Sequence, residues 1–308
     1  MKEFSGCAGI NITSSTLQIA EIENVNNVLQ LVNAGQTFVS PPIIFNNQDE
    51  NLIQDQLQTA FEELKVKNDI VSHVVSFTLP TELFITIQLP YDKNLNQAEV
   101  REEISWEISQ LYPHINIDEL ALKFYEMENS LFPTKPNALI VALNKRFLKL
   151  IKNFCTKNKL TPKLVDSASI TANSFINFFY SDNKPMSIHL FNERNSITLF
   201  INITTKPAYA KIFPKRGKDF VNKLLAEFSK DNIKKALSGS LKNAILSGEE
   251  LENEILEEIG RETELVFEKL NPFELIKFKP NTRPSDLLNE QFSSFAPAIG
   301  IASRFGQI

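Results

Sequence analysis

The sequence predicts an α/β protein built from two related lobes, with an extra subdomain inserted in the first lobe. Each half of the chain opens with three short strands, followed by a helix and a further strand, over residues 6–77 and 187–248. Residues 81–160 have no counterpart in the second half, so they read as an insertion. A chain of 308 residues with 43% hydrophobic residues can bury a large core in two lobes.

The elements of the first half follow from the spacing of apolar residues. Short runs that are apolar, or alternate with polar residues, predict strands, and apolar residues at helical spacing predict amphipathic helices. The expected strands are residues 6–12, 16–22, 28–32, 73–77, 83–89, 120–127 and 138–143. The expected helices are residues 48–67, 96–112, 144–159 (basic, with Asn144 as its cap) and 168–180.

The second half repeats the order of these elements. Its expected strands are residues 187–191, 197–203, 208–213, 244–248 and 265–267. Its expected helices are residues 218–228, 231–241, a helix ending at Ile259, and residues 292–305. Duplicated α/β lobes usually hold a ligand in the cleft between them, near the turns that join their first two strands. We therefore expect the site at the turn of residues 13–15 and at residues 191–194.

Composition excludes several classes of function. The net charge of −5 argues against nucleic acid as the main partner, because phosphate binding requires a basic face. No apolar run approaches the roughly 20 residues that span a bilayer, and a signal-peptide pattern is missing, which predicts a cytoplasmic protein without direct membrane insertion. Cys7 and Cys155 lie far apart, as expected in a reducing compartment. The three histidines lack metal-ligand spacing, so we assign neither a metal site nor a catalytic residue.

Seven stretches in this order resemble one family, the type IV pilus assembly protein PilM, a relative of the division protein FtsA in the actin-like ATPase superfamily. They are Gly9–Ser15, Leu79–Pro90, Trp106–Pro113, Val165–Ala168, Ile245–Gly248, Asn271–Phe273 and Phe295–Ala302. The resemblance implies an actin-like two-lobed fold, with duplicated βββαβα ribonuclease H-like lobes and an inserted α+β subdomain in the first lobe. It places the first lobe at residues 1–80 and 161–184, the insertion at 81–160 and the second lobe at 185–308.

The resemblance also implies a nucleotide site, and this sequence departs from the family pattern at each of the three turns that would contact the nucleotide. The family's first turn resembles Asp-x-Gly-Ser, where backbone N–H groups hold phosphate and the Asp orients hydrated magnesium. Here the matching residues are Asn11 and Thr13, although Ser14 and Ser15 keep their hydroxyls. The second such turn, expected near residues 191–194, reads Phe-Asn-Glu-Arg.

The adenosine loop, usually glycine-rich, retains Gly248 but continues with two glutamates, and Gly217 still matches a glycine of the family. The chain has 9 glycines, where average usage would give about 21. The predicted cofactor-binding residues are thus Asn11, Thr13, Ser14, Ser15, Gly217 and Gly248. Their altered surroundings predict a pseudo-ATPase that binds ATP or ADP with magnesium weakly or not at all; the alternative is an active actin-like ATPase.

For partners, the resemblance implies a scaffold at the inner-membrane platform of the pilus, which docks the cytoplasmic tail of the membrane protein PilN. The protein would then be peripheral at the inner membrane through that partner, and a homo-oligomer in the platform is a further expectation. Trp106 points away from the apolar stripe of the helix expected at residues 96–112. It either packs under a neighbouring subdomain or contacts a partner.

Overall fold

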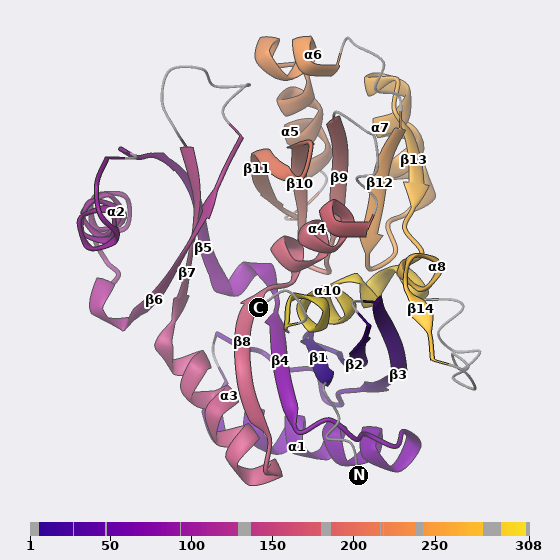
Figure 1. Ribbon diagram of the computed structural model, residues 1–308. Coiled ribbons are helices and arrows are strands. Elements are labelled where there is room, and N and C mark those ends of the chain that lie inside the picture. Colours follow the sequence, from indigo (N-terminus) through magenta and orange to yellow (C-terminus); the bar gives the residue numbers. More distant parts are fainter. Residues whose placement is uncertain are drawn as a thin grey trace.

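The computed structural model describes residues 6–279 and 291–305, except for residues 27, 47, 93, 129–136, 180–185, 216, 218 and 238–242 (Figure 1). Within these residues, no helix has both the length and the apolar character needed to cross a bilayer.

The first lobe is built on a six-stranded sheet in the order β14-β3-β2-β1-β4-β8. Its strands are β1 (Gly6–Ile12), β2 (Thr16–Val25), β3 (Val28–Phe38), β4 (Val74–Leu79), β8 (Thr161–Ser167) and β14 (Lys277–Phe278). The helices α1 (Glu50–Lys67) and α3 (Lys145–Asn158) pack on this sheet with apolar side chains such as Phe61 and Phe154. Asn144 caps α3 as predicted, because its Oδ1 accepts the backbone N–H of Arg146 at 2.9 Å.

The second lobe repeats this arrangement in a five-stranded sheet of order β11-β10-β9-β12-β13. Its strands are β9 (Met186–Asn192), β10 (Ser196–Ile203), β11 (Lys206–Pro214), β12 (Asn243–Gly248) and β13 (Val266–Lys269). Its helices are α5 (Asp219–Phe228), α6 (Asp231–Leu237) and α7 (Asn253–Thr263). In both sheets the first strand of the half lies between the second strand and a parallel fourth strand, so the predicted duplication is confirmed.

Two helices lie between the sheets, α4 (Ala168–Phe179) and α10 (Ala296–Phe305) (Figure 1). Helix α10 comes from the end of the chain but packs on β1 and β2 of the first sheet. The approach is close: a Cβ at Gly9 would lie 1.9 Å from the carbonyl oxygen of Ala298, so only glycine fits there. The short elements α8 (Pro272–Leu275), β14 and the 3₁₀ turn η3 (Phe292–Phe295) also lead back to the first lobe.

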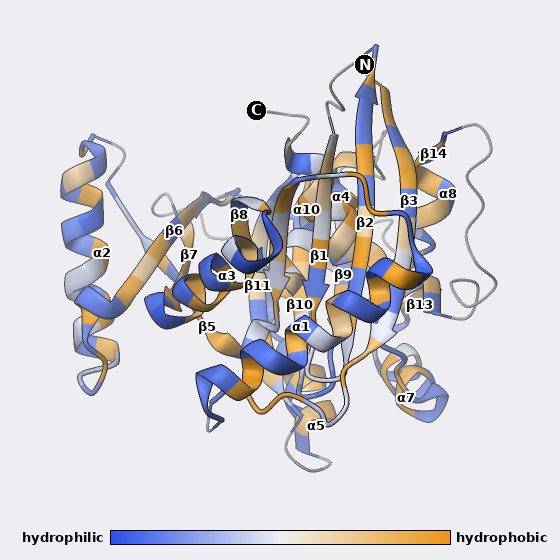
Figure 2. Cartoon of the chain, turned by 90° about the horizontal axis from the view of Figure 1, so that it is seen from below, coloured by the Kyte–Doolittle hydropathy of each residue, from blue (hydrophilic) through white to orange (hydrophobic). Residues whose placement is uncertain are grey.

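The inserted residues form a three-stranded antiparallel sheet of order β5-β7-β6, which we call the insert sheet. Its strands are β5 (Phe84–Pro90), β6 (Leu120–Glu126) and β7 (Asn137–Asn144), preceded by the 3₁₀ turn η1 (Thr81–Leu83). Helix α2 (Gln97–Leu111), which starts with a capping box of Asn96 and Glu99, covers one face. The other face packs Leu139 and Val141 against Phe200 of the second lobe. Figure 2 shows apolar strands at the centre and mixed polarity on α1, α2 and α3.

Candidate functional site: the interlobe cleft

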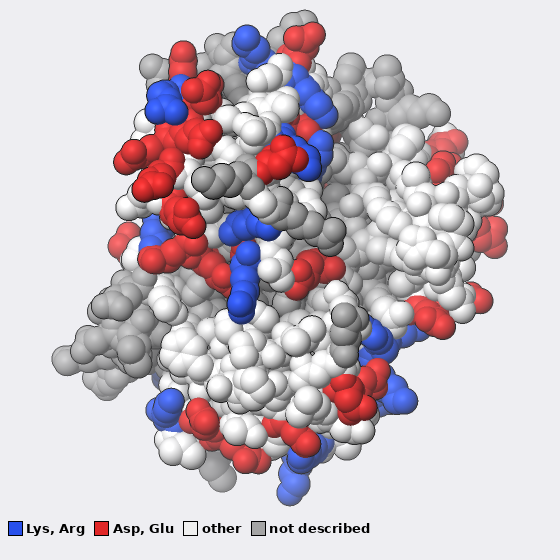
Figure 3. Space-filling model, turned by 180° about the vertical axis from the view of Figure 1, so that it is seen from behind, with Lys and Arg blue, Asp and Glu red and all other residues white. Residues whose placement is uncertain are grey.

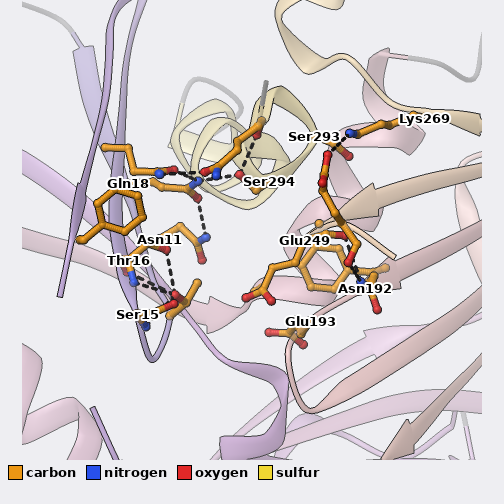
Figure 4. A pocket seen from close by; sticks show the side chains of 18 residues that line it. Asn11, Ser15, Thr16, Gln18, Asn192, Glu193, Glu249, Lys269, Ser293 and Ser294 are labelled. Atoms are coloured by element: carbon orange, nitrogen blue, oxygen red, sulfur yellow. Dashed lines mark hydrogen bonds and ion pairs between the residues drawn. The ribbon is translucent and has the colours of Figure 1, made fainter. Parts of the chain in front are cut away.

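A cleft of about 640 Å³ opens between the two lobes. It is lined by Asn11, Thr13, Ser15, Thr16, Gln18, Gln36, Phe38, Ala168, Phe191, Asn192, Glu193, Gly248, Glu249, Glu250, Lys269, Gln291, Ser293 and Ser294. Figure 4 shows Asn11, Thr16 and Gln18 on one side and Asn192, Glu193 and Glu249 on the other. The structure therefore brings together four residues that the sequence singled out, namely Asn11, Thr13, Ser15 and Gly248.

The other three predicted residues lie elsewhere. Ser14 lines an adjoining recess of about 20 Å³ next to Pro80 and Glu82. Gly217 follows β11 with a φ of 69°, and among the described residues other than its chain neighbours no heavy atom lies within 4 Å of the position of a Cβ there, so it is not part of the cleft lining. Trp106 is 60% exposed on α2, in the insert, and its partner role stays a prediction.

The first turn, residues 13–15, uses the N–H groups of Thr13, Ser15 and Thr16 in hydrogen bonds of its own. The N–H of Thr13 donates to the carbonyl of Thr16 at 2.9 Å. The Thr13 hydroxyl oxygen accepts the N–H groups of Ser15 at 3.2 Å and of Thr16 at 2.9 Å. A phosphate bound here would have to compete with that hydroxyl for both N–H groups.

Asn11 belongs to a neutral, hydrogen-bonded chain of side chains. It is buried; its Oδ1 accepts the Thr78 hydroxyl at 2.7 Å and its Nδ2 donates to Gln18 at 2.9 Å. Gln18 in turn donates to Gln36 and to Ser294, each at 2.7 Å. The side chain at this position thus carries no charge, and its donor and acceptor groups are both used within the protein, so the attraction for a hydrated cation is weak.

The second turn, residues 193–195, is held by the first lobe. Glu193 accepts the backbone N–H of Thr81 at 3.1 Å, and Asn195 donates to both carboxylate oxygens of Glu82 at 3.1 and 2.9 Å. We call these four residues the interlobe latch. Burial raises the pKa of Glu193 to about 7, against the hydrogen bonds from Thr81 and with a smaller contribution from the carboxylate of Glu249.

The loop after β12 folds over the end of β9. Gly248 has a φ of 96°, and a Cβ there would lie 2.1 Å from the carbonyl oxygen of Asn192. The Asn192 side chain donates to the carbonyls of Glu249 and Glu250, each at 3.0 Å. This glycine is therefore required by the local packing, whether or not a nucleotide binds.

The charges that line the cleft do not suit a polyphosphate. Three carboxylates line it, those of Glu193, Glu249 and Glu250, and the lining cation Lys269 is paired with Glu250 at 2.9 Å. Burial raises the pKa of Glu249, although Lys215 and Arg194 nearby oppose the shift. Among the described residues, no group of three His, Cys, Asp or Glu side chains is arranged to hold a metal ion.

Asp166, which lies in one of the seven sequence stretches, has a structural role outside the cleft. Its carboxylate accepts hydrogen bonds from Lys123 at 2.9 Å and from Tyr125 and Arg304. Burial alone would raise the pKa of Asp166, but the Arg304 guanidinium and the Lys123 ammonium outweigh burial and hold that pKa below its usual range. The ion-pair network joins β6 of the insert sheet to β8 and α10.

A second cavity, which we call the insert crevice, lies between the insert sheet and the second lobe and measures about 250 Å³. It is lined by Thr86, Ile87, Gln88, Leu139, Ser169, Ile170, Thr198, Phe200, Ala210, Lys211 and Ile212. The hydroxyl oxygens of Thr86 and Thr198 are buried and have no hydrogen-bond partner within the described part of the chain. The sequence carried no signal for this crevice, because residues from five separate segments form it.

Comparison with known proteins places this geometry in a family. No curated protein sequence matches the chain. Among solved structures, the PilM–PilN type IV pilus biogenesis complex matches with a TM-score of 0.71 and 17% identity, over 97% of this chain and 98% of that chain. A Bacteroides thetaiotaomicron protein with an actin-like ATPase fold and unknown function matches with a TM-score of 0.53 and 12% identity, over 88% of this chain and 95% of that chain.

Both likenesses show an actin-like fold, as the sequence predicted. The family model that describes type IV pilus assembly protein PilM matches residues 9–193, which is more than half of the chain. The chain therefore belongs to the PilM family of type IV pilus assembly proteins.

Proposed function

We propose that this protein is a cytoplasmic scaffold of a type IV pilus or related secretion platform, and that it docks the cytoplasmic tail of a PilN-like inner-membrane protein. In this proposal the protein is peripheral at the membrane through that partner, and its ATP site is weak or lost. Membership of the PilM family supports the assignment to a type IV pilus or related secretion platform. The solved PilM–PilN complex supports a PilN-like protein as the partner.

One observation carries the loss of the ATP site: Asn11 and two of the N–H groups at the first turn, which would hold metal and phosphate, are already used within the protein. The Thr13 hydroxyl takes two N–H groups of the first turn, and Asn11 is bonded to Thr78 and Gln18. Across the cleft, the carboxyl groups of Glu193, Glu249 and Glu250 line the wall, and in their ionised forms they would repel the phosphates of a nucleotide.

We place the partner's tail in the insert crevice. The strands β5 and β11 at its border are both edge strands, so an extended peptide can add backbone hydrogen bonds there. Within the described residues, the hydroxyls of Thr86 and Thr198 in the crevice have no hydrogen-bond partner, and a bound peptide backbone would supply one. Gln88 already bonds the Ala210 carbonyl across the gap at 2.6 Å, and a peptide would displace that contact.

A titration with a fluorescent peptide that copies the N-terminal cytoplasmic tail of the PilN-like protein tests the docking. Ile212→Trp narrows the crevice and should weaken binding by at least about tenfold, since a filled pocket cannot admit an anchor side chain. Ile117→Trp is the matched control, because Ile117 is also a half-buried isoleucine but lies in the α2 cluster away from the crevice. Absence of binding at about 50 μM, a weak affinity for a specific complex, or equal loss in both variants contradicts the proposal.

The large volume of the cleft keeps an active ATPase as the alternative function. Melting curves with and without ATP and magnesium separate the two, because a ligand that binds only the folded state must raise the melting temperature. We expect no shift for the natural chain. A large magnesium-dependent shift, with turnover of ATP, would establish the alternative.

A further inference from the structure

Helix α3 and the start of β8 form a strongly basic surface on a protein whose net charge is −5. Residues 145–165 contain seven Lys or Arg residues and no Asp or Glu. Two of them, Lys145 and Arg146, donate to backbone carbonyls of the protein. The other five are exposed lysines, which we call the basic face, namely Lys149, Lys152, Lys157, Lys159 and Lys163.

The lysines of the basic face are available to an outside partner. None of them forms an ion pair within the part of the chain that the structure describes. The opposite side of α3 is committed to the core, where Phe147, Ile151 and Phe154 pack against α1 and the first sheet. The lysines at residues 149–157 lie within about 12 Å along the helix, so their fields add within roughly one screening length.

Much of the acidic charge of the molecule lies on the second lobe, although α1, which packs beside α3, also carries the exposed residues Glu50, Asp55, Glu62 and Glu63. The second lobe carries Glu254, Glu257 and Glu262 on α7, with Glu264 and Glu268 close by in the sequence. Figure 3 shows acidic side chains gathered at the upper left, over this part of the second lobe, whereas α3 lies in the lower part of Figure 1. An anionic surface would therefore attract one side of the molecule and repel the other.

The chemistry of the basic face distinguishes a lipid surface from a protein partner. Stable protein interfaces are depleted of lysine at their centres and are built around apolar or aromatic anchors. The exposed large hydrophobic side chains of the described chain all lie outside residues 145–163. Attraction to anionic headgroups requires only clustered cations, each of which adds to the binding. Proteins that bind single-stranded nucleic acid use exposed aromatic side chains to stack on the bases. The aromatic residues of α3, Phe147 and Phe154, are buried instead.

We propose that the basic face of α3 is a contact surface for anionic phospholipid. The contact is electrostatic and reversible, because the apolar side of α3 stays in the core and nothing inserts into the bilayer. This lipid contact rests on the proposed function in one respect only, namely that the protein lies beside a membrane. It would orient the first lobe toward the bilayer and the acidic second lobe away from it.

Co-sedimentation with vesicles tests this surface with the purified full chain alone. Vesicles of phosphatidylglycerol and phosphatidylcholine should bind the protein at about 0.15 M salt and release it near 1 M, while pure phosphatidylcholine vesicles should not bind it. The combined variant Lys149→Glu, Lys152→Glu and Lys157→Glu should bind at least about tenfold more weakly. A Gln variant at the same three positions should show a smaller loss in the same direction.

The control variant changes the net charge equally at exposed positions elsewhere, with Lys234→Glu, Arg261→Glu and Lys277→Glu. It should stay within about twofold of the natural chain, because these cations lie away from the basic face. Equal loss in both charge-reversed variants, no binding to anionic vesicles, or tighter binding to duplex DNA than to those vesicles would overturn the proposal. The assay contains no peptide partner, so its failure leaves the docking of a PilN-like tail untouched.

Discussion

The two hairpin turns that face each other across the cleft share one backbone hydrogen bond but have different supports. In each turn the first residue donates its N–H to the third residue along, from Thr13 to Thr16 and from Glu193 to Ser196, both at 2.9 Å. The first turn is then closed by its own threonine hydroxyl, while the second is fastened to Thr81 and Glu82 of the other lobe. The two turns therefore use their polar groups differently, the first to stabilise itself and the second to stabilise the contact with η1.

The support behind the second turn can be broken with Gly248→Ala, which has the largest expected effect. The added Cβ would collide with the Asn192 carbonyl at 2.1 Å, at a φ of 96° that disfavours any side chain. We expect the free energy of unfolding to fall by about 2–4 kcal/mol, measured by urea denaturation. Gly217→Ala is the matched control, since it has positive φ in open space and should cost about 1 kcal/mol. Equal losses would show that backbone strain, and not the collision, decides the effect.

The first turn can be broken with Thr13→Val, which keeps the shape of the side chain but removes the hydroxyl. Two N–H groups, of Ser15 and Thr16, then lose their acceptor, and we expect a loss of about 1–2 kcal/mol by the same denaturation. Thr13→Ser should recover most of it. If Thr13→Val instead gives the protein a new affinity for phosphate without a loss of stability, the turn is a vacant anion site after all.

The comparison can be sharpened by pH, because only the second turn contains a titrating group. The pKa of Glu193 is raised from 4.5 to about 7 in the folded state, so folding favours its protonated form. Stability should therefore fall by about 1 kcal/mol as the pH rises from 4.5 through 7, after allowance for partial solvent screening. Glu193→Gln should flatten this part of the pH profile. An unchanged slope in that variant would assign the titration to another carboxylate, such as Glu249.

Most of the fold could be predicted from local sequence pattern, and the strands that were missed depend on pairing with distant parts of the chain. The hairpins, the capped helix α3 and the duplicated strand order all follow from apolar spacing and capping residues. Strand β8 was not predicted, because only Leu164 and Val165 are apolar and the residues at 161–163 are exposed; pairing with β4 makes it a strand. The two-residue strand β14 is likewise set by its pairing with β3. The four-residue helix α8 was also not predicted, although Asn271 caps it and Pro272 begins it.

The candidate site was predicted where the residues lie in one turn and missed where distant segments meet. The sequence indicated Asn11, Thr13 and Gly248, and these residues line one cleft. Nothing in the sequence indicated that Thr81 and Glu82, at the start of the insert, hold the second turn. Thr81 and Glu193, which form this contact, lie about 110 positions apart in the chain. The nucleotide role of the cleft residues and the division of the chain at residues 80, 160 and 184 stay predictions.

The position of α10 has a consequence for the order in which the lobes can fold during synthesis. Helix α10 packs on the face of the first sheet where Gly9 contacts Ala298, and it follows Gly9 by almost three hundred residues in the chain. The first lobe therefore cannot cover this face of its sheet until residues 296–305 have been made. The second lobe does not depend on α10 in this way, because its own apolar core is formed by residues 186–267.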